Sequence, residues 1–410
     1  STTPLYVYEL EVARQRARQL REMRAVDRVY FAIKANPLPE LLRVLHAEGV
    51  RFECVSVAEL RHVLAVLGLS AAQAQAAQLL LFTPNFAPRH EYSQAYALGA
   101  TVTCDGLHPL CRWPEVFSGR EVCLRLDLGL GDGHHAHVRT GGQRSKFGIE
   151  LERLAEASKA ATACGATVTA LHCHAGSGIL RPRAWVENAR LLAAAMHQHF
   201  PLVRSLDLGG GLGVPYRPGE QPLDLLQVDA SLLAFAQALR QELSATAVTS
   251  SLPSSSSSAS ESTTSSATAS SAEATPMHVP ELWLEPGRYL SAECGVLLAR
   301  VTQLKRKQLT AFVGVDAGFN SLLRPALYQS HHEIVNLTRL ASHLAGEETL
   351  QAVEVVGPIC ETGDVLGHDR ELPLSTAEGD ILLVATAGAY GHCMGSEYNM
   401  RAVAREHVLD

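Results

Sequence analysis

The most reactive candidate in the sequence is Lys34, which follows a short apolar run that contains Phe31 and Ile33. Burial beside apolar neighbours disfavours a charged ammonium, so we expect a lowered pKa and a nucleophilic amine that can form an imine. The competing interpretation is a solvated loop lysine, which is the commoner outcome for any single lysine. Lys34 therefore predicts an activity only in combination with other groups.

Three other features supply such groups. A glycine run would let backbone N–H groups approach a phosphate, although tight packing explains such a run equally well. His174 offers a ring-sized imidazole that could stack on a planar ligand, and Glu285 offers an acid for a ring nitrogen. An amine, a phosphate cradle, a stacking ring and an acid are together what pyridoxal 5'-phosphate requires, and we predict it as the cofactor. The cradle would comprise Gly209, Gly210 and Gly211, with Ser177 as a further donor.

The elements that must position these groups follow from an alternation of short apolar runs and amphipathic stretches, which is typical of parallel strands joined by crossover helices. We expect eight strands, at residues 30–33, 52–55, 79–82, 101–104, 122–126, 168–173, 205–208 and 282–284. Eight such units predict a closed (β/α)8 TIM-like barrel in the α/β class, with its active site at the carboxyl ends of the strands. A doubly wound open sheet is the alternative fold.

The rest of the chain indicates a second domain and an insertion. Residues 291–410 predict a C-terminal β-barrel or sandwich, with strand-like runs at 296–304, 310–315, 333–336, 351–356 and 380–384. The barrel domain is expected at 26–290, and residues 1–25 should partly join the β domain. Residues 249–275 form a Ser/Thr/Ala tract that cannot bury enough apolar surface to offset its ordering entropy, which predicts a disordered insertion.

The order of the motifs resembles the barrel-type pyridoxal phosphate decarboxylases, and among them the diaminopimelate decarboxylases. The matching segments are 3–8, 30–36, 146–148, 172–177, 285–288, 360–364 and 388–391. The resemblance implies a carboxy-lyase that converts meso-2,6-diaminopimelate to L-lysine and carbon dioxide in lysine biosynthesis. It also implies an obligate homodimer with shared active sites. The chain is further similar to the decarboxylase half of fused aspartate kinase proteins, so a covalent fusion to an aspartate kinase is an additional expectation.

The same resemblance implies a role for each site residue. Lys34 would carry the cofactor, His174 would stack on its ring, and Glu285 would face the ring nitrogen. Cys360 and Glu361 would enter the active site of the neighbouring subunit, where Cys360 would protonate Cα after carbon dioxide leaves. A small apolar core residue is the alternative for this cysteine. The remaining cofactor or substrate contacts are implied at Ser177, the glycine run, Gly287, Arg288, Arg324, Tyr328 and Tyr390.

The charges of the candidate site residues distinguish between the possible substrates. A substrate that ends in an amino acid needs cations for its distal carboxylate and an acid for its ammonium. By the resemblance, Arg324 meets the first need, with Arg288 and Tyr328 beside it, and Glu361 meets the second. These residues favour meso-diaminopimelate over ornithine. Related decarboxylases of arginine, ornithine or carboxynorspermidine are the alternative activities, and a non-catalytic regulator is the third possibility. Tyr390 could equally be a packing residue.

Composition restricts the classes of partner that the protein can bind and the compartment in which it acts. A net charge of −7 with a pI near 6.2 leaves no basic footprint for nucleic acid. Nine cysteines without a C-x-x-C pair indicate reduced thiols and a cytoplasmic location. The uncharged stretch 63–88 is punctuated by polar residues, so we expect a buried helix that leads into a strand and no membrane span. His134, His135 and His137 lie in a Gly-rich stretch that we interpret as a solvated loop, so no metal site is predicted.

Overall fold

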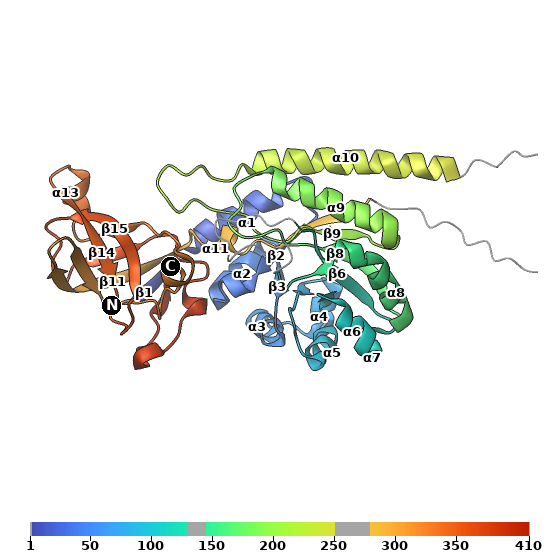
Figure 1. Ribbon diagram of the computed structural model, residues 1–410, viewed down its shortest axis with the longest axis horizontal. Helices are drawn as coiled ribbons and strands as arrows, with labels where there is room; N and C mark the ends of the chain where they lie inside the picture. The colour runs from blue at the N-terminus through green and yellow to red at the C-terminus, as the bar shows by residue number, and fades with distance from the viewer. Residues whose placement is uncertain (1, 130–144, 251–278, 410) are drawn as a thin grey trace, which may run out of the picture.

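The barrel domain contains eight parallel strands in a closed ring (Figure 1). The computed structural model describes residues 2–129, 145–250 and 279–409. In chain order the strands are β2 (Arg28–Ala32), β3 (Arg51–Cys54), β4 (Leu80–Phe82), β5 (Thr101–Cys104), β6 (Glu121–Asp127), β8 (Thr167–His172), β9 (Ser205–Asp207) and β10 (Glu281–Leu284). Each pairs with its neighbours in this order, and β10 pairs with β2 to complete the ring. The TIM-like barrel is confirmed, and the open sheet is excluded.

Alternation along the strands separates the inside of the barrel from its helical cover. On β2, Tyr30 packs with Trp283 of β10 in a small buried cluster, whereas the next residue, Phe31, joins the main core shared with the helices. The covering helices are α1 (Leu10–Arg21), α2 (Pro39–Ala47), α3 (Val57–Leu67), α4 (Ala71–Ala76), α5 (Arg89–Ala97), α6 (Leu107–Arg112), α7 (Pro114–Phe117), α8 (Leu154–Cys164), α9 (Arg183–His199) and α10 (Leu225–Ser250). The residues that follow each strand therefore face a common opening.

The second domain is an eight-stranded mixed sheet at the other end of the molecule (Figure 1). Its strands are β1 (Leu5–Tyr8), β11 (Gly295–Arg306), β12 (Ala311–Val315), β13 (Ile334–Asn336), β14 (Leu350–Val356), β15 (Val365–Pro373), β16 (Ile381–Val384) and β17 (Arg405–Val408). The sequence did not predict β15 or β17. Residues 368–371 in β15 are polar and mostly exposed, and β17 lies almost wholly exposed, so neither strand shows the apolar alternation of a half-buried strand.

The two domains are connected by the N-terminal segment, whose strand β1 belongs to the second sheet, and by hydrogen bonds at the barrel opening. The N-terminal β1 pairs with β11 and with the C-terminal β17. At the opening, the buried Asn36 side chain donates to the carbonyl of Gly388 at 2.8 Å, and the backbone N–H of Tyr390 donates to the carbonyl of Ala35 at 2.7 Å. The segment that follows β16 is therefore held against the residues that follow β2.

Some sequence-based expectations fall partly or wholly outside the described residues. The histidines at 134, 135 and 137 do, as do residues 251–275 of the Ser-rich tract. Residues 249 and 250, which were assigned to that tract, instead form the end of α10. In the stretch 63–88 the expected buried helix and strand are found as α3 and β4, with α4 between them. Among the described residues, no helix has the length and apolar character to cross a membrane.

Candidate active site

A cavity of about 420 Å³ lies at the carboxyl ends of the barrel strands, against the segment that follows β16. It brings together most of the predicted site residues from both domains. Its lining includes Lys34, His174, Ser177, Gly211, Glu285, Gly287, Arg288, Arg324, Tyr328 and Tyr390. Residues that the sequence places at the ends of separate strands therefore lie around one cavity.

Lys34 is held by an acid that the sequence analysis did not single out. It belongs to the single turn η1 (Ile33–Ala35) directly after β2, and its Nζ lies 2.7 and 2.9 Å from the two carboxylate oxygens of Glu53 on β3. Glu53 is fully buried and also accepts a hydrogen bond from the hydroxyl of Thr83. Its position between Phe52 and Cys54 in a predicted strand was the signal available in the sequence.

The expected lowering of the Lys34 pKa is wrong. Burial does lower the pKa of this amine, but the charge of Glu53, with help from Tyr390 and Glu285, outweighs burial and raises it above the usual lysine range. The lysine side chain is also 40 % exposed to the cavity, so its desolvation is incomplete. Without a bound ligand Lys34 is thus a protonated amine paired with a carboxylate.

His174 is an uncharged ring in the cavity. Burial, followed by the charges of Arg125 and Lys34, lowers the pKa of His174 to about 3. Its Nδ1 accepts the backbone N–H of Gly210 at 3.1 Å, which fixes the ring by an atom that carries no proton. A neutral imidazole suits stacking against a planar ring better than a cation would, because it needs no counter-charge when buried.

The glycine run has a packing role that the sequence left open. A Cβ at Gly209 would lie 2.3 Å from the carbonyl of Cys173, and one at Gly210 would lie 2.3 Å from the carbonyl of Glu285. Their backbone N–H groups bind Asp207 and His174, so neither is directed to a ligand in this arrangement. Gly211 lines the cavity and is the member of the run that remains a candidate for phosphate contact.

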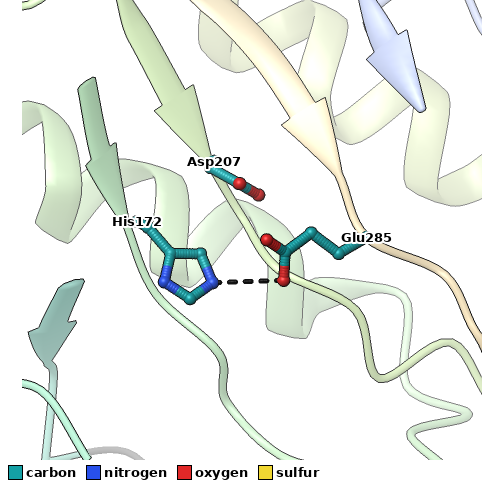
Figure 2. A group of neighbouring side chains, drawn as sticks. All are labelled: His172, Asp207 and Glu285. Carbon is teal, nitrogen blue, oxygen red and sulfur yellow. Dashed lines mark hydrogen bonds and ion pairs between the residues drawn. The ribbon is translucent and has the colours of Figure 1, made fainter. Parts of the chain in front are cut away.

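Glu285 belongs to a buried group of three titratable side chains, with His172 at the end of β8 and Asp207 at the end of β9 (Figure 2). His172 Nε2 donates to Glu285 Oε2 at 3.2 Å. The other Glu285 oxygen is buried without a hydrogen-bond partner, and so is Oδ2 of Asp207. Figure 2 shows the Asp207 carboxyl directed toward Glu285. Two buried carboxyl groups this close cannot both be charged at modest cost.

Asp207 is the member of the pair that holds a proton. Burial and the charge of Glu285 raise the pKa of Asp207 well above the usual range. Burial also acts to raise the pKa of Glu285, but His172, Lys34 and His174 outweigh it and lower that pKa. A protonated Asp207 can donate to the open Glu285 oxygen, which keeps Glu285 ionised and oriented where it lines the cavity. The sequence analysis gave no role to Asp207 or His172.

Two of the guanidinium groups that line the cavity, those of Arg288 and Arg324, are withdrawn from solvent without an acid partner. Arg288 donates to the hydroxyl of Tyr216 at 2.6 Å and to that of Ser177 at 3.0 Å. Arg324 is buried against the Tyr216 ring, 4.6 Å from its centroid, and burial lowers the Arg324 pKa. None of the ion pairs found in the described part of the chain involves either arginine. A buried or half-buried cation with only neutral partners is a site for an anionic group of a ligand.

Tyr390 and Tyr328 complete the lining from the β domain. Tyr390 adopts a positive φ of 56°, an uncommon conformation for a bulky residue, and its backbone N–H is bound to Ala35. This conformation places its ring 5.0 Å from the guanidinium of Arg288. Tyr216, which contacts both arginines, was missed by the sequence analysis because its contacts are made only in the folded chain.

Cys360 and Glu361 do not line the cavity of their own chain. Both are exposed on the loop between β14 and β15. The Cys360 backbone N–H donates to Asn399 at 2.7 Å, and Tyr398 donates to the Glu361 carboxylate at 2.7 Å. The buried carboxylate of Asp364 anchors the same loop by accepting two backbone N–H groups at 2.6 and 2.7 Å. An ordered, exposed loop thus carries two residues that the sequence assigned to chemistry.

Comparison with known proteins agrees with this geometry. Residues 10–292 match the family model described as the pyridoxal binding domain of pyridoxal-dependent decarboxylases. The chain belongs to the pyridoxal-dependent decarboxylase family. The diaminopimelate decarboxylase of Methanothermobacter thermautotrophicus is 32 % identical over 97 % of this chain and 85 % of its own length. The diaminopimelate decarboxylase of Escherichia coli K12 is 30 % identical over 99 % of this chain and 89 % of its own length. A crystal structure of a diaminopimelate decarboxylase matches with a TM-score of 0.83 and 28 % identity, over 99 % of this chain and 88 % of that one.

The residues of this pyridoxal-dependent decarboxylase fit the group that its family name implies. The cavity holds an amine at Lys34, a neutral ring at His174 and a carboxylate at Glu285 with an open oxygen. Arg288 lacks an acid, and its buried Nε has no partner, which suits a phosphate. The buried group His172, Asp207 and Glu285 also has the residue types of a metal site. The proton on Asp207 and the pairing of Glu285 with His172 explain that group without an ion.

Substitution of the acid that pairs with Lys34 tests the origin of its raised pKa. Glu53→Gln removes the largest raising influence and leaves burial, so the pKa of Lys34 should fall, by about 1 to 3 units. Attachment of pyridoxal phosphate requires an unprotonated amine, so its rate should rise with pH and level off at a correspondingly lower pH in the variant. The rate is measured by absorbance after the cofactor is added to stripped protein. Glu48→Gln, which removes a half-buried acid paired with two arginines, is the control; identical profiles for both variants would contradict the assignment.

Substitution of Asp207 tests whether it acts as a neutral donor. Asp207→Asn preserves a donor for Glu285 and an acceptor for the Gly209 N–H, so cofactor affinity should stay within about threefold of the unmodified protein. Asp207→Ala leaves buried polar atoms unsatisfied, and affinity should fall about tenfold or more. Fluorescence titration with pyridoxal phosphate measures both. Equal losses in the two variants would show that Asp207 is needed as an anion.

Proposed function

We propose that this chain is a pyridoxal phosphate-dependent carboxy-lyase that converts meso-2,6-diaminopimelate to L-lysine and carbon dioxide. The observation that carries the substrate assignment is Arg324, a buried cation without an acid, which faces the same cavity as Lys34. An arginine in this state is suited to a carboxylate at the end of the substrate remote from the reacting carbon. Relatives named diaminopimelate decarboxylase, matched over nearly the whole chain, support the proposal.

The cofactor and the residues of the chain have different roles in the proposed reaction. Pyridoxal phosphate, when bound, supplies a ring that accepts the electron pair of the breaking Cα–carboxylate bond. Lys34 would attach the cofactor, His174 would pack against its ring, and the ionised Glu285 would hold a proton at the ring nitrogen. Ser177, Gly211 and the Gly287–Arg288 turn would hold the phosphate, with Tyr390 beside them. In these roles His174 acts as a neutral ring and Glu285 as an anion, which are the charge states that their surroundings impose.

The proton that replaces carbon dioxide at Cα requires a donor. We assign that donor to Cys360 and the acid for the distal ammonium to Glu361, both supplied by a second copy of the chain. The support is their exposure on an anchored loop outside their own cavity. The proposed assembly is therefore a homodimer with shared active sites. All nine cysteines are unpaired thiols, which supports a reducing, cytoplasmic compartment.

Substrate preference tests the assignment of Arg324. Carbon dioxide release should be fastest with meso-diaminopimelate, and slower with ornithine, arginine or carboxynorspermidine, which have no distal carboxylate. Arg324→Ala should raise KM for diaminopimelate about 100-fold, because a charge-assisted contact is lost. Arg306→Ala, at an exposed arginine of β11, is the control and should leave KM unchanged. A preference for ornithine in the unmodified protein would overturn the assignment.

Mixing of inactive variants tests the shared site. Lys34→Ala and Cys360→Ala should each be nearly inactive alone. After the two are mixed and allowed to exchange subunits, about one quarter of normal activity should return, because half of the dimers are mixed and each of these has one complete site. Carbon dioxide release measures the recovery, and the double variant in a single chain mixed with Lys34→Ala is the control. No recovery despite proven subunit exchange would place both residues in one chain's site.

A further inference from the structure

Arg324 is oriented by neutral groups alone. It is the first residue of α12 (Arg324–Tyr328) and is 5 % exposed. Its Nη1 donates to Nε2 of His332 at 2.8 Å, its Nη2 donates to the hydroxyl of Ser330 at 3.3 Å, and its guanidinium lies 4.6 Å from the centroid of the Tyr216 ring. No carboxylate in the described part of the chain forms an ion pair with it. The full positive charge of Arg324 is therefore left for a ligand.

The protonation of His332 is fixed by its two partners. A guanidinium can only donate, so the Nε2 that receives Arg324 carries no proton. A backbone carbonyl can only accept, so the Nδ1 that lies 2.8 Å from the carbonyl of Ala385 carries one. His332 is therefore the neutral tautomer with its proton on Nδ1. Burial and the charge of Arg324 lower the pKa of His332 to about 3, in agreement with the geometry.

The neutrality of His332 has a consequence for ligand binding. A carboxylate at this position would also accept a hydrogen bond from Arg324, but it would cancel the charge and compete with the ligand's carboxylate. An imidazole that accepts one hydrogen bond orients the guanidinium and leaves the charge in place. The ring itself is locked, since His332 is fully buried, packs edge-on to Tyr216 with centroids 5.3 Å apart, and is tied to the segment that follows β16.

We propose that His332 is a positioning residue for substrate selection: as a neutral acceptor it fixes the direction of the Arg324 guanidinium without neutralising it, so that Arg324 selects substrates with a carboxylate at the end remote from Cα. This inference rests on the proposed function and specifies how the same site distinguishes its substrate class. His332 is outside the cavity lining and acts through Arg324. Its substitution should therefore change substrate binding more than the chemical step.

Two substitutions test the hydrogen bonds of the two His332 ring nitrogens separately. The amide of glutamine reaches as far as Nε2, so His332→Gln keeps an acceptor for Arg324. The amide of asparagine reaches only as far as Nδ1, so His332→Asn keeps the bond to Ala385 and loses the contact with Arg324. We expect His332→Asn to raise KM for meso-diaminopimelate about 10- to 100-fold with kcat within about threefold, and His332→Gln to restore KM to within about threefold. His368→Asn, at an exposed histidine of β15, is the control.

The product and a diamine that lacks its carboxylate provide a second measurement. Decarboxylation removes the carboxylate at the reacting carbon, so L-lysine keeps the distal carboxylate and its inhibition constant should rise together with KM in His332→Asn. Cadaverine has no carboxylate and does not need Arg324, so its inhibition constant should be the same, within about threefold, in the unmodified protein and in His332→Asn. A general loosening of the cavity would weaken cadaverine as much as diaminopimelate and would overturn the proposal. If His332→Asn does not fold, His332→Gln decides the question, because a KM as high as that of Arg324→Ala would also overturn it.

A double-mutant cycle tests whether His332 acts through Arg324. If it does, His332→Asn should add no more than about twofold to KM in an Arg324→Ala background. Independent, multiplying effects would overturn the proposal. The result also separates this inference from the function on which it rests. Failure of the unmodified protein to release carbon dioxide from meso-diaminopimelate would remove both, whereas normal release with an unchanged KM in folded His332→Asn would remove only the role of His332.

Discussion

A cation withdrawn from water needs an anion, and two guanidinium groups of the cavity, the buried Arg324 and the half-buried Arg288, form no ion pair within the described residues. Arg288 is bound by the hydroxyls of Tyr216 and Ser177, and Arg324 by His332 and Ser330. Leaving such charges unpaired in a protein interior is costly, so the arrangement is sensible only for a ligand that brings its own negative groups. A phosphate and a distal carboxylate meet that requirement.

The acids of the site, unlike these two arginines, have partners within the chain. Glu53 is paired with Lys34, Glu285 accepts a hydrogen bond from His172, and the carboxylate of Glu220 accepts two backbone N–H groups. None of these acids therefore forms an ion pair with Arg288 or Arg324. The neutral state of Asp207 results from the closeness of two buried carboxyl groups, of which only one can be charged. Lys34, His174 and Glu285 thus each have a charge state set by their neighbours, and the ligand meets a site in which these charges are already in place.

The site also depends on the contact between the two domains. The barrel contributes the amine, the stacking ring and the acid, whereas Arg324 and Tyr390 come from the β domain. Hydrogen bonds from Asn36 to Gly388 and from Tyr390 to Ala35 hold the second set over the first. Neither domain alone contains the cavity, which explains why residues from position 34 to position 390 are needed for one small-molecule site.

The eight-stranded barrel was predictable from the amino-acid sequence, because strand and helix periodicities are local, and the same pattern marked Lys34, His174 and Glu285 as residues that follow strands. It did not determine the raised pKa of Lys34 or the packing role of Gly209 and Gly210, and it overlooked β15 and β17, whose polar pattern hides them. Glu53, Asp207, Tyr216 and His332 acquire their roles only from the folded chain. Charge state and hydrogen-bond direction depend on neighbours that are distant in the sequence, so they can be assigned only in the folded chain.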